Sequence, residues 1–133
     1  MSMELVNLIR TGEINSIKEI IKSNPALVNA CDQRGFTPLI LATYMGQKEI
    51  AKLLIENGAE IDAQDAVGNT ALMGVCFKGS PELAEILITK GANIDIANNE
   101  GETALSFAQN YGQNAIEQLL IAADANQTLE ENS

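Results

Sequence analysis

The chain has 133 residues and a formal net charge of −10 at pH 7, from 18 acidic and 8 basic residues. A chain so acidic lacks the basic footprint that nucleic acid or an anionic membrane attracts, so we expect neither as a partner. It also contains no histidine, which removes the commonest general base and metal ligand. With no Ser–His or Cys–His pair and no glycine-rich phosphate loop, we expect no enzyme activity and no cofactor.

The acidic excess is uneven along the chain. Residues 1–66 hold nine acids and six bases, whereas residues 67–133 hold nine acids and two bases. From residue 98 onward there are six acids and no base. Solubility accounts for this asymmetry, and so does a partner with a basic surface that binds the last two units, so both explanations stay open.

An internal period of 33 residues is the strongest signal in the sequence. Residues 32–64 match residues 65–97 at 13 of 33 positions, and residues 65–97 match residues 98–130 at 9. The period is plainest at three positions, which hold Gly35, Gly68 and Gly101, then Thr37, Thr70 and Thr103, then Leu39, Leu72 and Leu105. The chain is therefore an array of one structural unit, too small to bury its own apolar face without neighbours.

We divide the array into units 1–31, 32–64, 65–97 and 98–126. The first unit is degenerate, since only residues 17–29 align at the 33-residue offset. In the others the threonines are suitable N-caps for a first helix, which a glycine ends before a second helix begins. The remaining residues, 127–133, are polar, and we expect them to form a disordered tail.

This pattern resembles the ankyrin repeat, D-x-x-G-x-T-P-L-H followed by A, G and L-L-x-x-G-A, over roughly residues 3–126. The resemblance implies an all-α solenoid of stacked helix–turn–helix units with projecting β-turn or hairpin loops. The chain departs from the family where histidine commonly follows T-P-L, because Ile40, Met73 and Ser106 stand there. The hydrogen bonds that this histidine makes between neighbouring turns are therefore in doubt.

Gly74 is a second irregularity, because its equivalents Leu41 and Phe107 are expected to be buried. A mid-helix glycine costs about 1 kcal/mol relative to alanine. We expect the ring of Phe107, from the next unit, to fill the space that Gly74 leaves. Asp32 and Asp65, at the start of their units, are interpreted as turn formers rather than as acid–base or metal-binding carboxylates.

The resemblance also implies that partners bind the concave surface, built from the turn tips, the residue between Gly and Thr, and the end of the first helix. Mapped onto this chain, the predicted partner-binding residues are Gln33, Arg34, Phe36, Tyr44, Met45, Val67, Asn69, Phe77, Lys78, Glu100, Glu102, Asn110 and Tyr111. Four of the five aromatic residues fall in this set, and aromatic side chains dominate interface hot spots. Packing of helix-end rings against the adjacent turn is the competing explanation for Tyr44 and Phe77.

The sequence therefore predicts a monomeric, cytoplasmic protein–protein interaction module, an adaptor or inhibitor that binds another protein through an aromatic strip with an acidic C-terminal margin. Cys31 and Cys76 lie in non-equivalent places and are expected to remain thiols, which suits a reducing compartment. No apolar run is long enough to span a membrane.

Three alternatives stay open. The first is an immunity or neutralising protein whose acidic C-terminal half blocks a basic site on a toxin or enzyme. The second is a stack that responds to a metal or small molecule through its acidic turns. The third is a scaffold fragment of a larger assembly.

Overall fold

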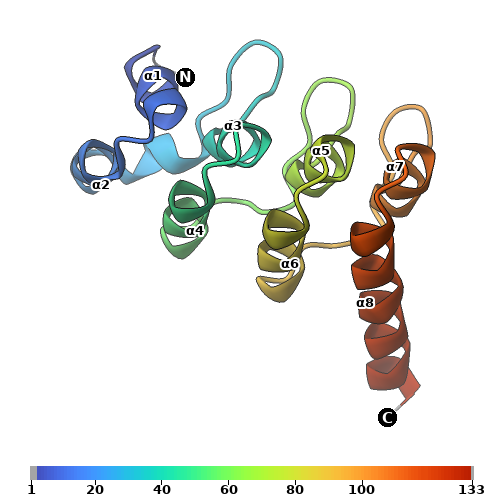
Figure 1. Cartoon of the computed structure of the whole chain (residues 1–133). Coiled ribbons are helices and arrows are strands. Elements are labelled where there is room, and N and C mark those ends of the chain that lie inside the picture. Colours follow the sequence, from blue (N-terminus) through green and yellow to red (C-terminus); the bar gives the residue numbers. More distant parts are fainter. Residues whose placement is uncertain (1–2, 133) are drawn as a thin grey trace.

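The computed structural model describes residues 3–132 and shows an all-α array of helix pairs standing side by side in a row (Figure 1). In chain order the helices are α1 (Met3–Thr11), α2 (Ile14–Ser23), the short 3₁₀ helix η1 (Pro25–Asn29), α3 (Pro38–Tyr44), α4 (Lys48–Glu56), α5 (Ala71–Lys78), α6 (Pro81–Thr89), α7 (Ala104–Asn110) and α8 (Asn114–Asn132). The predicted stack of helix–turn–helix units is confirmed. Long loops precede α3, α5 and α7 and project from the same side of the row (Figure 1).

Threonine side chains start the first helix of the last three pairs, α3, α5 and α7, as the period predicts. The hydroxyl oxygen of Thr37 accepts from the Ile40 N–H at 3.1 Å, and Thr70 and Thr103 accept equivalent bonds at 3.3 and 3.2 Å. Each bond satisfies one N–H that the first helical turn leaves without a partner. Because the caps recur every 33 residues, α3, α5 and α7 begin in register and present equivalent faces.

The core consists of equivalent apolar positions that stack from unit to unit. Three such rows are at most 2% exposed: Ala42, Val75 and Ala108; Ile50, Leu83 and Ile116; and Leu54, Leu87 and Leu120. Burying a side chain the size of leucine contributes about 1.5–3 kcal/mol, and here each burial requires a neighbouring unit. Leu105 is half-buried although its equivalents Leu39 and Leu72 are buried, since it lies in the last helix pair of the row.

The projecting turns are built around an aspartate or asparagine at the start of the second, third and fourth units. One carboxylate oxygen of Asp32 accepts from the backbone N–H groups of Arg34 and Phe36, both at 2.9 Å. Asp65 and Asn98 make the same pair of bonds in the following turns. The turn-forming role predicted for Asp32 and Asp65 is confirmed, and the amide of Asn98 performs it equally well.

Neighbouring turns are joined without histidine: a backbone bond from Ala66 to the Arg34 carbonyl joins the first two, and side-chain amides help to join the last two. Asn98 donates to the side-chain oxygen of Asn69 at 2.8 Å, and Asn99 donates to the carbonyl of Ala66 at 3.2 Å. Ser106 instead makes hydrogen bonds within its own unit. Its hydroxyl accepts from the Thr103 N–H at 2.8 Å and donates to the Glu102 carboxylate. The network that the sequence put in doubt is therefore made by other residues.

The end of the chain differs from the expectation. We predicted a disordered tail over residues 127–133, but α8 continues to Asn132. The reason is local: no glycine or proline follows Gly112, and residues such as Ala, Gln, Leu and Glu favour helix. Residue 133 lies outside the described residues.

Candidate functional site

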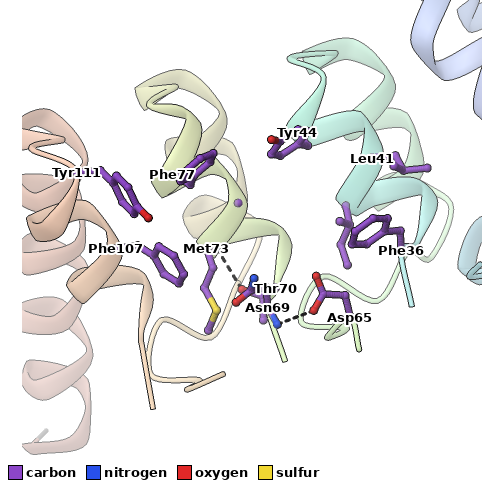
Figure 2. Close-up of a pocket in the computed structure, with 12 residues that line it drawn as sticks. Phe36, Leu41, Tyr44, Asp65, Asn69, Thr70, Met73, Phe77, Phe107 and Tyr111 are labelled. Atoms are coloured by element: carbon purple, nitrogen blue, oxygen red, sulfur yellow. Dashed lines mark hydrogen bonds between the residues drawn. The ribbon is translucent and has the colours of Figure 1, made fainter. Parts of the chain in front are cut away.

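A groove of about 470 Å³ crosses α5 on the side of the row formed by α3, α5 and α7 (Figure 2). Its lining is mostly apolar and includes every aromatic residue in the chain. Those residues are Phe36, Tyr44, Phe77, Phe107 and Tyr111, joined by Ile40, Leu41, Asp65, Asn69, Thr70, Met73 and Gly74. We call this hollow the aromatic groove.

Helical spacing explains why the rings share one face. Tyr111, the C-cap of α7, is four residues from Phe107, and Leu41 and Tyr44 are three apart on α3, so each pair lies on one side of its helix. Phe36 stands immediately before the N-cap Thr37, which places its ring at the opposite end of α3 from Tyr44 (Figure 2). The walls of the groove thus come from the first helices of three successive units and from the loops that precede α3 and α5.

Three of the rings form a connected cluster. The Phe77 and Tyr111 rings meet edge to face, with centroids 4.9 Å apart and planes at 86°. The Phe107 and Tyr111 rings are stacked, with centroids 6.0 Å apart and planes at 11°. Such contacts add stability beyond area burial and hold the rings in fixed orientations. Phe77 and Tyr111 nevertheless remain 43% and 51% exposed, so packing does not bury them.

Two cations cover ring faces at the edge of the groove. The ammonium nitrogen of Lys78 lies 4.7 Å from the centroid of Tyr44, and the guanidinium carbon of Arg34 lies 4.6 Å from the centroid of Phe36. Arg34 also pairs with the Asp32 carboxylate at 3.6 Å. The pKa of Asp32 lies below its ordinary value, mainly because the Phe36 N–H donates to the carboxylate, with Arg34 adding to the effect against desolvation.

Gly74 lies in the floor of the groove, and the side chain that faces it is not the expected one. A Cβ built on Gly74 would approach Tyr44 Cδ2 at 3.9 Å, and within 4 Å it would meet no other atom outside its own helix in the described chain. The predicted filling of this space by Phe107 is therefore wrong. Leu41 and Phe107, expected to be buried, are half-buried and line the groove.

The thirteen predicted binding residues divide into two sets. Five of them line the aromatic groove: Phe36, Tyr44, Asn69, Phe77 and Tyr111. The other eight lie outside its lining: Gln33, Arg34, Met45, Val67, Lys78, Glu100, Glu102 and Asn110. Binding by any of them stays a prediction. Sequence reasoning missed Phe107, although its spacing of four residues from Tyr111 is a signal that the two rings share a face.

Other chemistry is not assembled in the part of the chain that the structure describes. No three His, Cys, Asp or Glu residues there come close enough to hold a metal ion. Cys31 is exposed and Cys76 is buried, and neither forms a disulfide. Burial raises the pKa of the Cys76 thiol to about 12. Within residues 3–132, no helix is both long and apolar enough to cross a bilayer.

Comparison with known proteins defines the class. The sequence matches the family described as Ankyrin repeats (3 copies) over residues 5–65 and again over residues 57–130. The chain therefore belongs to the ankyrin-repeat family, whose repeats are protein–protein interaction modules.

Two curated relatives match shorter stretches. Over 55 residues the chain is 40% identical to DNA-binding protein RFXANK of Homo sapiens, which covers 41% of this chain and 21% of that protein. Over 53 residues it is 34% identical to Ankyrin repeat and SAM domain-containing protein 6 of Danio rerio, which covers 40% of this chain and 7% of that protein. The similarity thus spans less than a quarter of either relative.

Proposed function

We propose that this chain is a non-enzymatic protein–protein interaction module, an adaptor or inhibitor, that binds a partner protein through the aromatic groove on its concave face. One observation carries the proposal: all five aromatic residues of the chain line a single open groove. Large aromatic side chains usually contribute strongly to a hydrophobic core, because each can bury about 150–250 Å² of surface. Here the buried rows are aliphatic, and the rings face the groove.

The geometry of the groove suits an interaction hot spot. Tyr44, Phe77 and Tyr111 are 46%, 43% and 51% exposed, so a partner can cover a large area of each ring. Their mutual contacts and the cation over Tyr44 reduce the freedom that binding would otherwise remove. Aromatic anchors of this kind carry most of the energy in typical interfaces.

The charge of the chain limits the partner class. RFXANK is named a DNA-binding protein, but we do not extend that property to this chain, since a net charge of −10 repels phosphate. We propose a protein partner and a reducing compartment such as the cytoplasm, because Cys31 and Cys76 are thiols.

A second candidate function rests on the acidic end of the chain. Residues 98–133 hold six acids and no base, which suits a neutralising protein that blocks a basic site on a toxin or enzyme. This candidate makes binding depend on Glu100 and Glu102 more than on the rings. It also makes association strongly dependent on salt.

Affinity purification from the native cell, with quantitative mass spectrometry, tests the proposal. The wild-type chain is compared with a Phe36→Ala/Phe77→Ala double variant and with Ile121→Ala, a matched control because Ile121 is an exposed apolar residue outside the groove. We expect a specific partner to be retained by wild type and by Ile121→Ala and lost by the double variant. The double variant should melt within roughly 5 °C of wild type, since its losses are at half-exposed positions.

Two outcomes would decide against the groove. A partner retained at full strength by the double variant would place the binding surface elsewhere. A partner lost on changing Glu100 and Glu102 to glutamine, but kept by the double variant, would favour the neutralising function instead.

A further inference from the structure

Gly74 has no conformational role in the fold. Nine of the ten glycines in the chain have a positive φ, which other residues rarely adopt, and Gly74 is the tenth. It lies within α5 and its N–H donates to the Thr70 carbonyl at 3.2 Å, as any helical residue would. A glycine here costs the helix about 1 kcal/mol relative to alanine without providing a turn or a close backbone approach.

The consequence of Gly74 is the hollow itself. Its equivalents in the neighbouring units, Leu41 and Phe107, both extend side chains into the aromatic groove. The equivalent position on α5 has no side chain, and the groove is lined there by Gly74 beside Met73. The absence of one side chain from a row of three thus produces a hollow with rings on either side.

The volume and the walls of the groove indicate which kind of side chain it can accept. The groove, about 470 Å³, is within the ~300–1,000 Å³ typical of sites that enclose a ligand group. Three of its rings, Phe77, Phe107 and Tyr111, are already held by contacts with each other. An apolar group that enters therefore removes ring surface from water at little cost in conformational entropy. A bulky aliphatic or aromatic side chain suits this surface better than a polar one.

The projecting turns carry a charge gradient along the array. At the turn tips, the equivalent positions hold Arg34, Val67 and Glu100, so the row passes from basic through apolar to acidic. Arg34 is already paired with Asp32. No ion pair in the described part of the chain involves Glu100 or Glu102. The last unit therefore carries negative charge at its turn that no cation of the described chain neutralises.

We propose that the aromatic groove receives a bulky apolar side chain from a linear segment of a partner protein, seated over Gly74, while a lysine or arginine of the same segment meets Glu100 and Glu102. The inference rests on the proposed function and specifies the chemistry of the partner. The apolar side chain supplies affinity, and the basic residue sets the direction in which the segment crosses the units.

A displayed library of random 12-residue peptides is the probe, selected on the full chain. We expect the enriched peptides to carry a Leu, Ile, Met, Phe or Trp near a Lys or Arg. One enriched peptide is then synthesised, and its Kd is measured by fluorescence polarisation. The variants are Gly74→Leu, Gly74→Met, Gly74→Ala and the Glu100→Gln/Glu102→Gln pair.

Filling the hollow should weaken binding of that peptide by at least ~10-fold for Gly74→Leu and Gly74→Met, which corresponds to the loss of about 1.4 kcal/mol. Gly74→Ala adds one methyl group at an ordinary contact distance from Tyr44 and should change Kd by less than about 3-fold. The glutamine pair should weaken binding at low salt, with the difference shrinking at high salt. Thermal melts confirm that each variant is folded. If either Gly74→Leu or Gly74→Met fails to fold, the other still tests whether the hollow is used.

Several results would overturn the inference. Enriched peptides that bind Gly74→Leu and Gly74→Met as tightly as wild type would show that the hollow is not used. Peptides without a basic residue, or no enrichment at all, would contradict the proposed segment. Dimerisation of the wild type that Gly74→Leu abolishes, measured by light scattering, would make a second copy the occupant. Failure of the proposed function is seen separately, as peptides or partners that bind the Phe36→Ala/Phe77→Ala variant normally.

Discussion

The ring of Phe77, at the end of α5, meets the ring of Tyr111, just beyond α7, edge to face at 4.9 Å between centroids. The two residues come from different units and are not equivalent in the period, since the counterpart of Phe77 in the last unit is Asn110. Their contact closes one wall of the aromatic groove. It links the stability of the array to the shape of its candidate site.

This contact predicts energetic coupling between the two residues. In a double-mutant cycle with Phe77→Ala and Tyr111→Ala, we expect a coupling free energy of about 0.5–1.5 kcal/mol, the range measured for edge-to-face aromatic pairs. Urea denaturation of the four proteins measures it. The pair Tyr44→Ala and Tyr111→Ala is the control, because the structure gives no ring contact between them, and its effects should add. Additive effects for Phe77 and Tyr111 would show that the rings do not interact in solution.

Alanine substitutions at three glycines should change the free energy of unfolding by different amounts. Gly74→Ala should stabilise the protein by about 1 kcal/mol, since alanine is the better helix former and its Cβ meets Tyr44 at an ordinary distance. Gly101→Ala should destabilise by about 1–2 kcal/mol because φ is +79° there, although the space around it is open. Gly68→Ala should cost more than either, because φ is +88° and the new Cβ would lie 2.8 Å from the backbone nitrogen of Asn99.

Urea midpoints and slopes for the three variants test this order. If Gly74→Ala proved as destabilising as Gly101→Ala, Gly74 would be needed by the backbone. The argument that its effect is to open the groove would then fail.

The 33-residue period predicted the structural features that equivalent positions of the units share. It did not predict the features that arise where the units differ. Caps at Thr37 and Thr70 and the buried row of Ile50, Leu83 and Ile116 follow from local propensity and repeated burial, so a sequence pattern suffices for them. Phe107 and its equivalent Leu41 were both expected to be buried. Both side chains instead line the groove, and Tyr111 stacks on the Phe107 ring.

The absence of the family's histidine likewise did not indicate which residues would form hydrogen bonds between the turns. The bond between Asn98 and Asn69 joins turns whose relative placement arises from stacking, and a 33-residue pattern does not encode which side chains meet across it. The groove has the same origin, as its lining comes from three units. Four of its five rings were nevertheless predicted to lie on the concave surface, because the resemblance to the ankyrin repeat implies which positions of each unit face it.

The two cysteines predict a large difference in reactivity. Cys31 is exposed, whereas Cys76 is buried with its pKa raised to about 12, so at pH 8 little of Cys76 is in the reactive thiolate form. A thiol reagent such as Ellman's should label one thiol quickly in the native protein and the second only in denaturant. Cys31→Ser removes the fast phase and Cys76→Ser the slow one. Fast labelling of the Cys31→Ser variant in native buffer would show that the α5 core opens readily.

The first turn predicts a dependence of stability on pH that asparagine removes. The folded pKa of Asp32 lies below its ordinary value of 3.8, chiefly because the Phe36 N–H donates to the carboxylate. A group whose pKa is lowered by folding stabilises the protein above its unfolded pKa, and this contribution is lost as the pH falls through the folded value.

The wild type should therefore lose stability below about pH 4 more steeply than Asp32→Asn. The asparagine keeps the acceptor for the Arg34 and Phe36 N–H groups, as Asn98 does for its own turn, so any advantage of the wild type over Asp32→Asn should shrink as the pH falls. Asp32→Ala removes the acceptor and should be less stable than Asp32→Asn at every pH. Urea midpoints between pH 3 and pH 7 separate the three proteins, and equal pH slopes for wild type and Asp32→Asn would mean that the carboxylate's charge has no part in holding the turn.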